Sequence, residues 1–482
     1  MRTMTKHLPF LALLFVLAAA CHAQTVVQQA DSDVYSGAPS PISDHPNMTI
    51  ASNGTYVMTQ TFQNVNIYNV SDLSLQSTTA KATFLTNAGC PGSTGGGESR
   101  LIYDPFNSRW IMVAAAQPDF MIVSSGSDPT TSTWKCLALS ANSGDLLMQL
   151  GFDKNWVYVS EFLACSGANA QRLIAIPTAD VAWSGGGTIS LTHEVIDDCH
   201  TYDAIPIRDL NASKGLTAPG YFISRVGEQQ GGGNVALTLT IDTFTPTTAT
   251  AGTFNAGASP TTITTGWVYN APKTVNQPGS PGGITSGESH RPFTFMTVDD
   301  NTAWVAWGSG NCHTSCPVSQ GIDSNQLAFF FQINIPALTL NQKLKWSDGS
   351  LGYLFPALAL DSSGNMVATA TGCSTTQFCS LYSIYQLTTD TAGTFHGPNL
   401  VTAGTQNYQQ CPPHGTPPGW GDYADAAQDP STPSRLWFLH EYANSATPCD
   451  WFTHIVEYQP AATPATPTSI VPASQLLARV TR

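Results

Sequence analysis

Ionisable and phenolic side chains recur in this chain directly before short apolar segments. Glu98 and Arg100 precede the apolar segment 101–103, and Tyr353 precedes the apolar segment 354–360. Groups of this kind that converge in one pocket can recognise a sugar, bind a cation or acquire shifted pKa values. The candidate ligand-binding residues defined by this position are His45, Glu98, Arg100, Asp145, Glu288, His290, Arg291, Tyr353, Asp422 and Tyr423.

Three interpretations of this set are open. Carboxylate oxygens are ligands for a hard cation, so Ca²⁺ is the cofactor that the sequence suggests. Two carboxyl groups about 5 to 9.5 Å apart could instead act as acid and base on a glycan. In the third interpretation the groups only cap strand ends and surround ordered water. The metal candidates are Glu98, Asp145, Glu288 and Asp422.

The elements that must position these residues repeat along the chain. Each copy has a polar start, a short strand, a turn and a second apolar strand, and about seven copies follow at intervals of roughly 50 to 70 residues. Asp is typical of such turns because its carboxylate bonds nearby backbone N–H groups. A repeat of this period predicts an all-β fold, a β-propeller of six or seven four-stranded blades. In a propeller the innermost strands begin near the central channel, so the polar starts should converge there. The clearest turns lie at Asn53-Gly54, Asp104-Pro105, Asp153, Asp299, Asp361 and Asp429-Pro430.

The chain divides into three segments. Residues 1–23 are expected to be a secretion signal, with Arg2 and Lys6 before an apolar core that is too short to span a bilayer. Cys21 offers an alternative, as a lipidation site that would anchor the protein. Residues 24–458 are the predicted propeller, and residues 459–482 are a Pro/Thr-rich tail that we expect to be disordered. No later segment is apolar enough for a transmembrane helix, so we expect a secreted protein, extracellular or periplasmic.

The acidic composition excludes one class of partner. Of 18 Lys and Arg residues, 16 remain after Arg2 and Lys6 are removed, against 32 Asp and Glu, which gives a net charge of −16. Such a protein is repelled by the phosphates of nucleic acid and by anionic membranes. We therefore expect no nucleic-acid partner. The expected partner is a glycan or a cell-surface component, and the protein itself is expected to be a monomer.

The cysteines fit an oxidising compartment. Without Cys21, ten of the 11 cysteines remain, and an even number predicts five disulfides. The sequence leaves the connectivity open; pairing in chain order is expected, because each bond then closes within a blade or between neighbours. Cys312 and Cys316 flank His313, but without a second ligand pair nearby a small loop disulfide is favoured over a metal site. The ten are Cys90, Cys136, Cys165, Cys199, Cys312, Cys316, Cys373, Cys379, Cys411 and Cys449.

Enzyme signatures are mostly absent. The chain has no Gly-x-Ser-x-Gly elbow, no His-Glu-x-x-His helix and no phosphate-binding Gly loop. His193-Glu194 and His440-Glu441 are isolated pairs, and each His is expected to be a satisfied group at the surface or at a blade edge. Five tryptophans on outgoing strands are expected in the core between blades and not in a sugar platform. They are Trp110, Trp156, Trp304, Trp307 and Trp437.

Three segments resemble bacterial secreted propellers of the sialidase-like superfamily. They are 100–110, Ser127-Asp128-Pro129 with Trp134, and 420–423 with Asp429-Pro430, and the repeat pattern extends over residues 40–458. The segment from Ser127 to Trp134 is similar to the family's Asp box, in which a carboxylate caps a turn at the blade edge. It lacks the central Gly and has one extra residue. The resemblance implies the fold more than an activity, because the superfamily contains sialidases, other glycan-active enzymes and uncharacterised extracellular members.

For a sialidase, the resemblance implies three arginines that clamp the substrate carboxylate, a Tyr–Glu pair as nucleophile and base, and an Asp as acid/base. Arg100 and Arg291 stand at equivalent positions of the repeat, but a third arginine can be added only by forcing the alignment of the repeats. We therefore expect a non-catalytic member that acts as an extracellular ligand- or surface-binding module. The alternative is a glycan-active enzyme, a glycoside hydrolase or lyase, that uses the central pocket. Whether the protein is an enzyme stays open here, and no catalytic residue is assigned.

Overall fold

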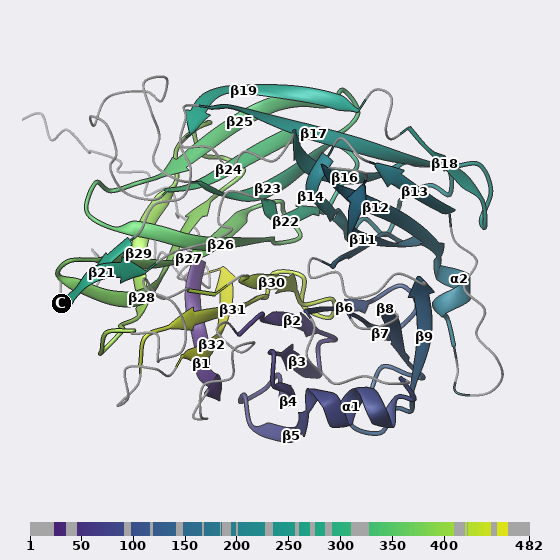
Figure 1. Cartoon of the computed structure of the whole chain (residues 1–482), viewed down its shortest axis with the longest axis horizontal. Coiled ribbons are helices and arrows are strands. Elements are labelled where there is room, and N and C mark those ends of the chain that lie inside the picture. The colour runs from purple at the N-terminus through teal and green to yellow at the C-terminus, as the bar shows by residue number, and fades with distance from the viewer. Residues whose placement is uncertain are drawn as a thin grey trace, which may run out of the picture.

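The structure is a computed structural model, and it describes residues 24–34, 46–90, 98–115, 119–140, 148–165, 168–183, 185, 194–198, 201–226, 235–255, 260–269, 275–284, 292–309, 327–408, 420–421, 423–444 and 451–460. These residues form β-sheets and two short helices, α1 (Lys81–Asn87) and α2 (Thr178–Val181). Neither helix of this described part is long and apolar enough to cross a membrane. The sheets stand around a common centre (Figure 1), so the predicted all-β class and propeller arrangement are confirmed.

Five sheets are separate blades of four or five strands. In each, the strand nearest the centre is followed outward by antiparallel neighbours. The blades are β2 (Thr49–Ser52), β3 (Tyr56–Gln60), β4 (Asn64–Asn69) and β5 (Leu75–Ala80); β6 (Ser99–Asp104), β7 (Arg109–Ala114), β8 (Asp119–Ser124) and β9 (Trp134–Ser140); β14 (Thr201–Pro206), β16 (Gly220–Val226) and β17 (Val235–Pro246) with β18 (Gly252–Phe254) and β19 (Thr261–Tyr269); β26 (Gly352–Leu360), β27 (Met366–Ser374), β28 (Gln377–Gln386) and β29 (His396–Thr402); and β30 (Asp425–Gln428), β31 (Leu436–Tyr442), β32 (Phe452–Pro460) and β1 (Gln24–Val34).

The predicted count of six or seven blades is wrong, because further strands merge into one nine-stranded sheet. Two antiparallel groups in it are joined by the short strand β15 (Arg208–Asp209), which pairs in parallel with β10 (Gln149–Phe152) and with β22 (Pro292–Thr297). The inner strands approach closely here, since a Cβ on Gly151 would lie 2.3 Å from the carbonyl oxygen of Ile207. The groups are β10 (Gln149–Phe152), β11 (Trp156–Cys165), β12 (Ala168–Pro177) and β13 (Glu194–Asp198), and β22 (Pro292–Thr297), β23 (Thr302–Ser309), β24 (Leu327–Asn334) and β25 (Thr339–Trp346); the hairpin β20 (Val275–Gln277) and β21 (Ser280–Ile284) is separate.

Side-chain-capped turns follow the innermost strands, as the repeat predicts. Asp104 Oδ1 accepts hydrogen bonds from the backbone N–H groups of Phe106 and Asn107, at 2.9 and 3.2 Å. The same cap occurs at all six turns named from the sequence and at Asp209 in β15. The propeller therefore has two distinct faces. We call the face where the innermost strands begin the strand-start face, and the face with the capped turns the turn face.

The core lies between neighbouring sheets. The second strand of a blade is buried on both sides, and all seven residues of β31 are buried. Trp110 packs with Met58 of the preceding blade, whereas Trp437 packs with Val57 of the first blade from the opposite side. All five tryptophans expected between blades are buried, with at most 2% of their surface exposed. A blade cannot cover both of its faces alone, which explains why these strands are apolar along their whole length.

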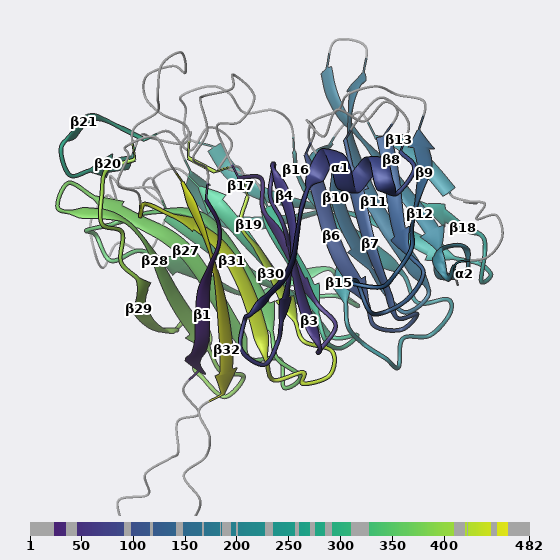
Figure 2. The same ribbon diagram turned by 90° about the horizontal axis from the view of Figure 1, so that it is seen from below.

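Strand β1 joins the beginning of the described chain to its end. It pairs antiparallel with β32 from Gln24 opposite Pro460 to Val34 opposite Phe452, and Figure 2 shows the two strands side by side. Side chains add to this pairing, because Asp31 Oδ1 accepts a hydrogen bond from the Tyr442 hydroxyl at 2.8 Å. The last blade is thus completed by the first strand, which closes the ring.

Two disulfides are present among the described residues. Cys90 bonds to Cys136, and Cys373 bonds to Cys379. Both follow the chain order that the sequence analysis expected, so sequential pairing is confirmed for these four cysteines. Cys199, Cys312, Cys316, Cys411 and Cys449 lie outside the described residues, as do the segment 1–23 and the tail after Pro460, and the structure does not describe the side chain of Cys165.

We expect the two disulfides to stabilise the fold unequally. They span 46 and 6 residues, and the entropy of loop closure in the unfolded chain then predicts losses of about 4 kcal/mol for Cys90–Cys136 and about 2 kcal/mol for Cys373–Cys379 when both cysteines of a bond are changed to Ala. Urea unfolding of the two double variants measures this difference. A larger loss from the shorter loop would contradict the expectation.

Candidate functional site

Three of the predicted ligand-binding residues meet at the strand-start face. The Tyr423 hydroxyl donates a hydrogen bond of 2.6 Å to Glu98 Oε2, although the two residues lie 325 positions apart in the chain. The guanidinium carbon of Arg100 lies 3.3 Å from the centre of the Tyr423 ring, and Arg100 Nε donates to Gln149 Oε1 at 3.0 Å. The starts of β6, β10 and β30 therefore bring a carboxylate, a guanidinium, an amide and a phenol together. The expected convergence is observed for these positions, and their role in binding stays a prediction.

These side chains are nearly enclosed by protein. Glu98, Arg100 and Tyr423 expose 6%, 3% and 3% of their surface. Lys81, at the start of α1, is also buried, and burial lowers the pKa of its ammonium group to about 7 although the Glu98 carboxylate acts to raise it. Lys81 was not among the predicted site residues, because it follows the outer strand β5 and does not stand at a repeat start. We call Glu98, Arg100 and Tyr423, with Lys81 and Gln149, the strand-start cluster.

Tyr353 is placed elsewhere. Its hydroxyl donates a hydrogen bond of 2.7 Å to Asp348 Oδ2, and its ring centre lies 4.4 Å from that of Trp346. The ring is fully buried in the core between β25 and β26, and burial raises the pKa of the phenol far above its usual range. The hydroxyl therefore makes its hydrogen bond within the core. Gly372 leaves room for the rings packed here, since a Cβ on it would lie 2.8 Å from the Tyr382 ring and 3.1 Å from the Tyr353 ring. Sequence position alone did not reveal this role.

The other predicted site residues lie outside the described residues. They are His45, Asp145, Glu288, His290, Arg291 and Asp422. Of the four metal candidates only Glu98 is described, so the structure does not test the set. Within the described ranges, no group of three or more His, Cys, Asp or Glu side chains could hold a metal ion.

A buried ion pair crosses the centre of the propeller. Arg208 Nη1 of β15 lies 2.8 Å from Asp425 Oδ1 of β30, and its Nη2 lies 3.3 Å from Asp425 Oδ2. Asp425 Oδ2 also accepts hydrogen bonds from the Thr49 hydroxyl at 2.6 Å and from Ile50 N–H at 3.2 Å. Both side chains are almost enclosed, with 11% and 5% exposed. The carboxylate is therefore fully engaged by protein donors. The pair was not predicted, because Asp425 follows the polar start at Asp422 and Tyr423, and Arg208 was not placed at a polar start.

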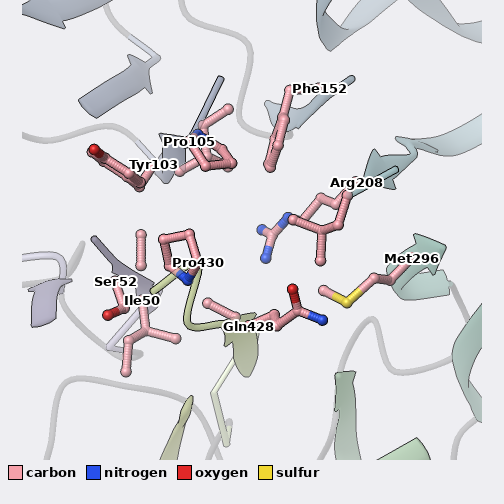
Figure 3. A pocket seen from close by; sticks show the side chains of 13 residues that line it. Ile50, Ser52, Tyr103, Pro105, Phe152, Arg208, Met296, Gln428 and Pro430 are labelled. Atoms are coloured by element: carbon pink, nitrogen blue, oxygen red, sulfur yellow. The ribbon is translucent and has the colours of Figure 1, made fainter. Parts of the chain in front are cut away.

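A cavity opens beside this pair at the turn face (Figure 3). It contains about 380 Å³ of empty space, part of which is open solvent, and is lined by the ends of innermost strands and their turns. The Arg208 guanidinium points into it, between Phe152 and Gln428, as Figure 3 shows. The walls are mostly apolar. They include Tyr103, Pro105, Phe152, Met296 and Pro430.

His440 is an internal structural residue. Its Nε2 lies 2.7 Å from the Thr369 hydroxyl, and the ring is 1% exposed. Burial lowers the pKa of the imidazole to about 3, so the ring is neutral at physiological pH. The expectation of a satisfied His is confirmed, but the residue lies in the core between β27 and β31 and not at a blade edge.

Comparison with known proteins does not show a family. No protein-family model and no curated protein matches the chain. The extracellular domains 1-2 of Drosophila Semaphorin 1a are 8% identical over 89% of this chain and 88% of that one, with a TM-score of 0.42. An ulvan lyase, a polysaccharide lyase, is 9% identical over 70% and 76%, with a TM-score of 0.36. A subtype N10 neuraminidase-like protein of A/little yellow-shouldered bat/Guatemala/060/2010 is 8% identical over 72% and 96%, with a TM-score of 0.35. At these values the likeness carries no argument about activity.

The central ion pair should show strong coupling in a double-mutant cycle. Changing Asp425 to Ala leaves the Arg208 cation buried without its partner, which typically costs about 3–5 kcal/mol of unfolding free energy. Adding Arg208→Met to that variant should recover at least ~1 kcal/mol relative to the sum of the two single losses. Urea unfolding of the four proteins measures the coupling. Additive losses would show that the two residues act independently.

The neutral His440 should make stability fall with acid. An unfolded His binds its proton near pH 6.5, whereas the folded His440 binds it only near pH 3, so its contribution is complete above about pH 6.5 and is lost as the pH falls toward 3. The slope is at most about 1.4 kcal/mol per pH unit. His440→Gln retains a partner for the Thr369 hydroxyl and should have a shallower profile in urea unfolding between pH 7 and 4.5. Parallel profiles for the two proteins would contradict this assignment.

Proposed function

We propose that the protein is a secreted binding module that recognises a glycan or a cell-surface component through the strand-start cluster. The observation that carries this proposal is that the described carboxylates near the axis are already engaged. Asp425 accepts hydrogen bonds from Arg208, Thr49 and Ile50, and Glu98 accepts a hydrogen bond from the Tyr423 hydroxyl. Carboxylates that already bond to protein donors favour a binding role over catalysis. Acid/base catalysis on a glycan needs two carboxyl groups that face the substrate.

The cluster contains the groups that sugar hydroxyls and anionic substituents use. Arg100 supplies a cationic donor, Lys81 supplies an amine, Gln149 supplies an amide, and Glu98 supplies an acceptor. Their low exposure favours a rigid site whose geometry is fixed before the ligand arrives. The two disulfides support an oxidising location outside the cytoplasm, since such bonds persist there. A Ca²⁺ ion at Glu98 with Asp145, Glu288 and Asp422 is part of the proposal to be tested.

A glycan-active enzyme is the second candidate, and one contact favours it. Tyr423 and Glu98 form a Tyr–Glu pair at 2.6 Å beside an arginine, and the resemblance to sialidases implies such a pair as nucleophile and base. The contact makes Glu98 the group that would accept the phenolic proton. Binding is preferred because the Arg100 guanidinium covers one face of the Tyr423 ring, which obstructs attack on a substrate.

Thermal unfolding with and without Ca²⁺ or EDTA, followed by a panel of sialylated, acidic and neutral glycans, tests the proposal. A ligand at a hundredfold excess over its Kd stabilises the folded protein by about 2.7 kcal/mol. We expect a glycan to raise the Tm of the natural protein and to lose this effect in Tyr423→Phe. Tyr353→Phe is the matched control, because it also removes a buried hydroxyl that is bonded to a carboxylate.

The outcomes separate the candidates. A shift that survives in Tyr353→Phe and disappears in Tyr423→Phe supports binding at the strand-start cluster. Release of product from a glycan, abolished by Glu98→Gln, supports the enzyme instead. A calcium-dependent shift that Glu98→Gln removes supports the cation site. If no glycan changes the Tm, or if the two Tyr variants respond alike, the cluster has only a structural role and caps strand ends.

A further inference from the structure

Some N–H donors of Arg208 at the turn-face cavity bond no acceptor among the described residues. Its Nη1 is occupied by Asp425 Oδ1 and by the Ala426 carbonyl, and its Nη2 donates to Asp425 Oδ2. Within the described part of the chain, Nε–H and the second Nη2 hydrogen bond no acceptor. Because Asp425 neutralises the guanidinium charge, the remaining donors favour a neutral acceptor, such as a peptide carbonyl, over an anion.

The walls of the cavity fit a particular kind of peptide. Tyr103, Phe152, Pro105 and Pro430 present rings around the Arg208 donors. Polyproline-II segments bind in this way, since their pyrrolidine rings pack on aromatic side chains while their carbonyl groups stay free to accept hydrogen bonds. Three residues complete each turn of this helix, so two prolines spaced as Pro-x-x-Pro lie on the same side.

The chain carries such a segment shortly after its last described strand. The sequence Pro464-Ala465-Thr466-Pro467 follows closely after the end of β32 at Pro460. β32 runs in the same direction as β30, and Gln428 at the cavity, Leu436 and Tyr458 are paired in one row across the blade. Two strand spacings put Tyr458 about 10 Å from Gln428. An extended polyproline-II segment of eight residues reaches about 25 Å, which is enough to enter the cavity.

We propose that this cavity is a polyproline-II docking site whose occupant is the protein's own C-terminal segment 461–468. The tail crosses the turn face from the end of β32, a proline ring enters between Phe152 and Pro430, and Arg208 donates to a backbone carbonyl of the segment. The site is separate from the strand-start cluster and does not depend on the function proposed for it.

A competition experiment tests this proposal. The probe is a fluorescently labelled peptide with the sequence of residues 459–470, and its binding is measured by anisotropy to the full chain and to a chain that ends at Pro460. We expect the truncated chain to bind the peptide at least tenfold more tightly, because the tethered tail has an effective concentration in the millimolar range and competes in the full chain. Replacing Pro464 and Pro467 by Ala in the peptide should weaken binding to the truncated chain at least tenfold.

Ala427→Phe is the matched protein variant, because Ala427 lines the cavity at a half-buried position and a larger ring there fills the space. The truncated chain with this change should keep its Tm within a few degrees and lose peptide binding. Failure of the truncated chain to bind the peptide overturns the proposal, and so does equal binding by Ala427→Phe with an unchanged Tm. Equal binding to the full and truncated chains overturns the tail as occupant. Concentration-dependent dimerisation that needs residues 461–468 would instead assign the site to the tail of a second copy.

Discussion

Arg208 and Asp425 connect parts of the propeller that no single blade holds together. Arg208 belongs to a strand of two residues that pairs in parallel with both β10 and β22, while Asp425 begins the innermost strand of the last blade. The carboxylate also binds Thr49 and Ile50 at the start of the first blade. Burial of two charges carries a desolvation cost of several kcal/mol per ion, and the dense set of hydrogen bonds offsets it. The arrangement of the inner strands therefore depends on this pair, in which Arg208, Thr49 and Ile50 fully engage the Asp425 carboxylate.

Much of the fold could be predicted because its signals are local. An Asp or Asn that caps a turn acts on backbone groups two or three residues away, so Asp104 and Asp429 identify the ends of innermost strands from sequence alone. Trp110 and Trp437 likewise indicate the core, because a strand that is apolar on both faces must be covered on both sides. These features recur in each repeat and need no knowledge of distant contacts.

The remaining features depend on contacts across the ring. The merging of strands through β15 requires the backbone at Ile207 to approach Gly151 closely, and no local sequence pattern predicts this contact. Tyr353 occupies a repeat start like Tyr423, yet its hydroxyl meets Asp348 and stays in the core, whereas Tyr423 reaches Glu98 from another blade. Lys81 joins the cluster from a helix outside the repeat. Position within a repeat thus predicts which residues approach the centre, and packing decides which of them face one another.

The pairing of β1 with β32 also determines where the protein can be attached to a surface or to another module. Gln24 lies opposite Pro460 at the same edge of the last blade, so both ends of the described chain leave the ring at one point on the turn face. A surface, a tag or a second module joined to either end would hold the propeller by that face. The strand-start cluster would then be presented outward, in the same orientation whichever end is used. A tether at either end and the cluster proposed for binding would therefore lie on opposite faces of the propeller.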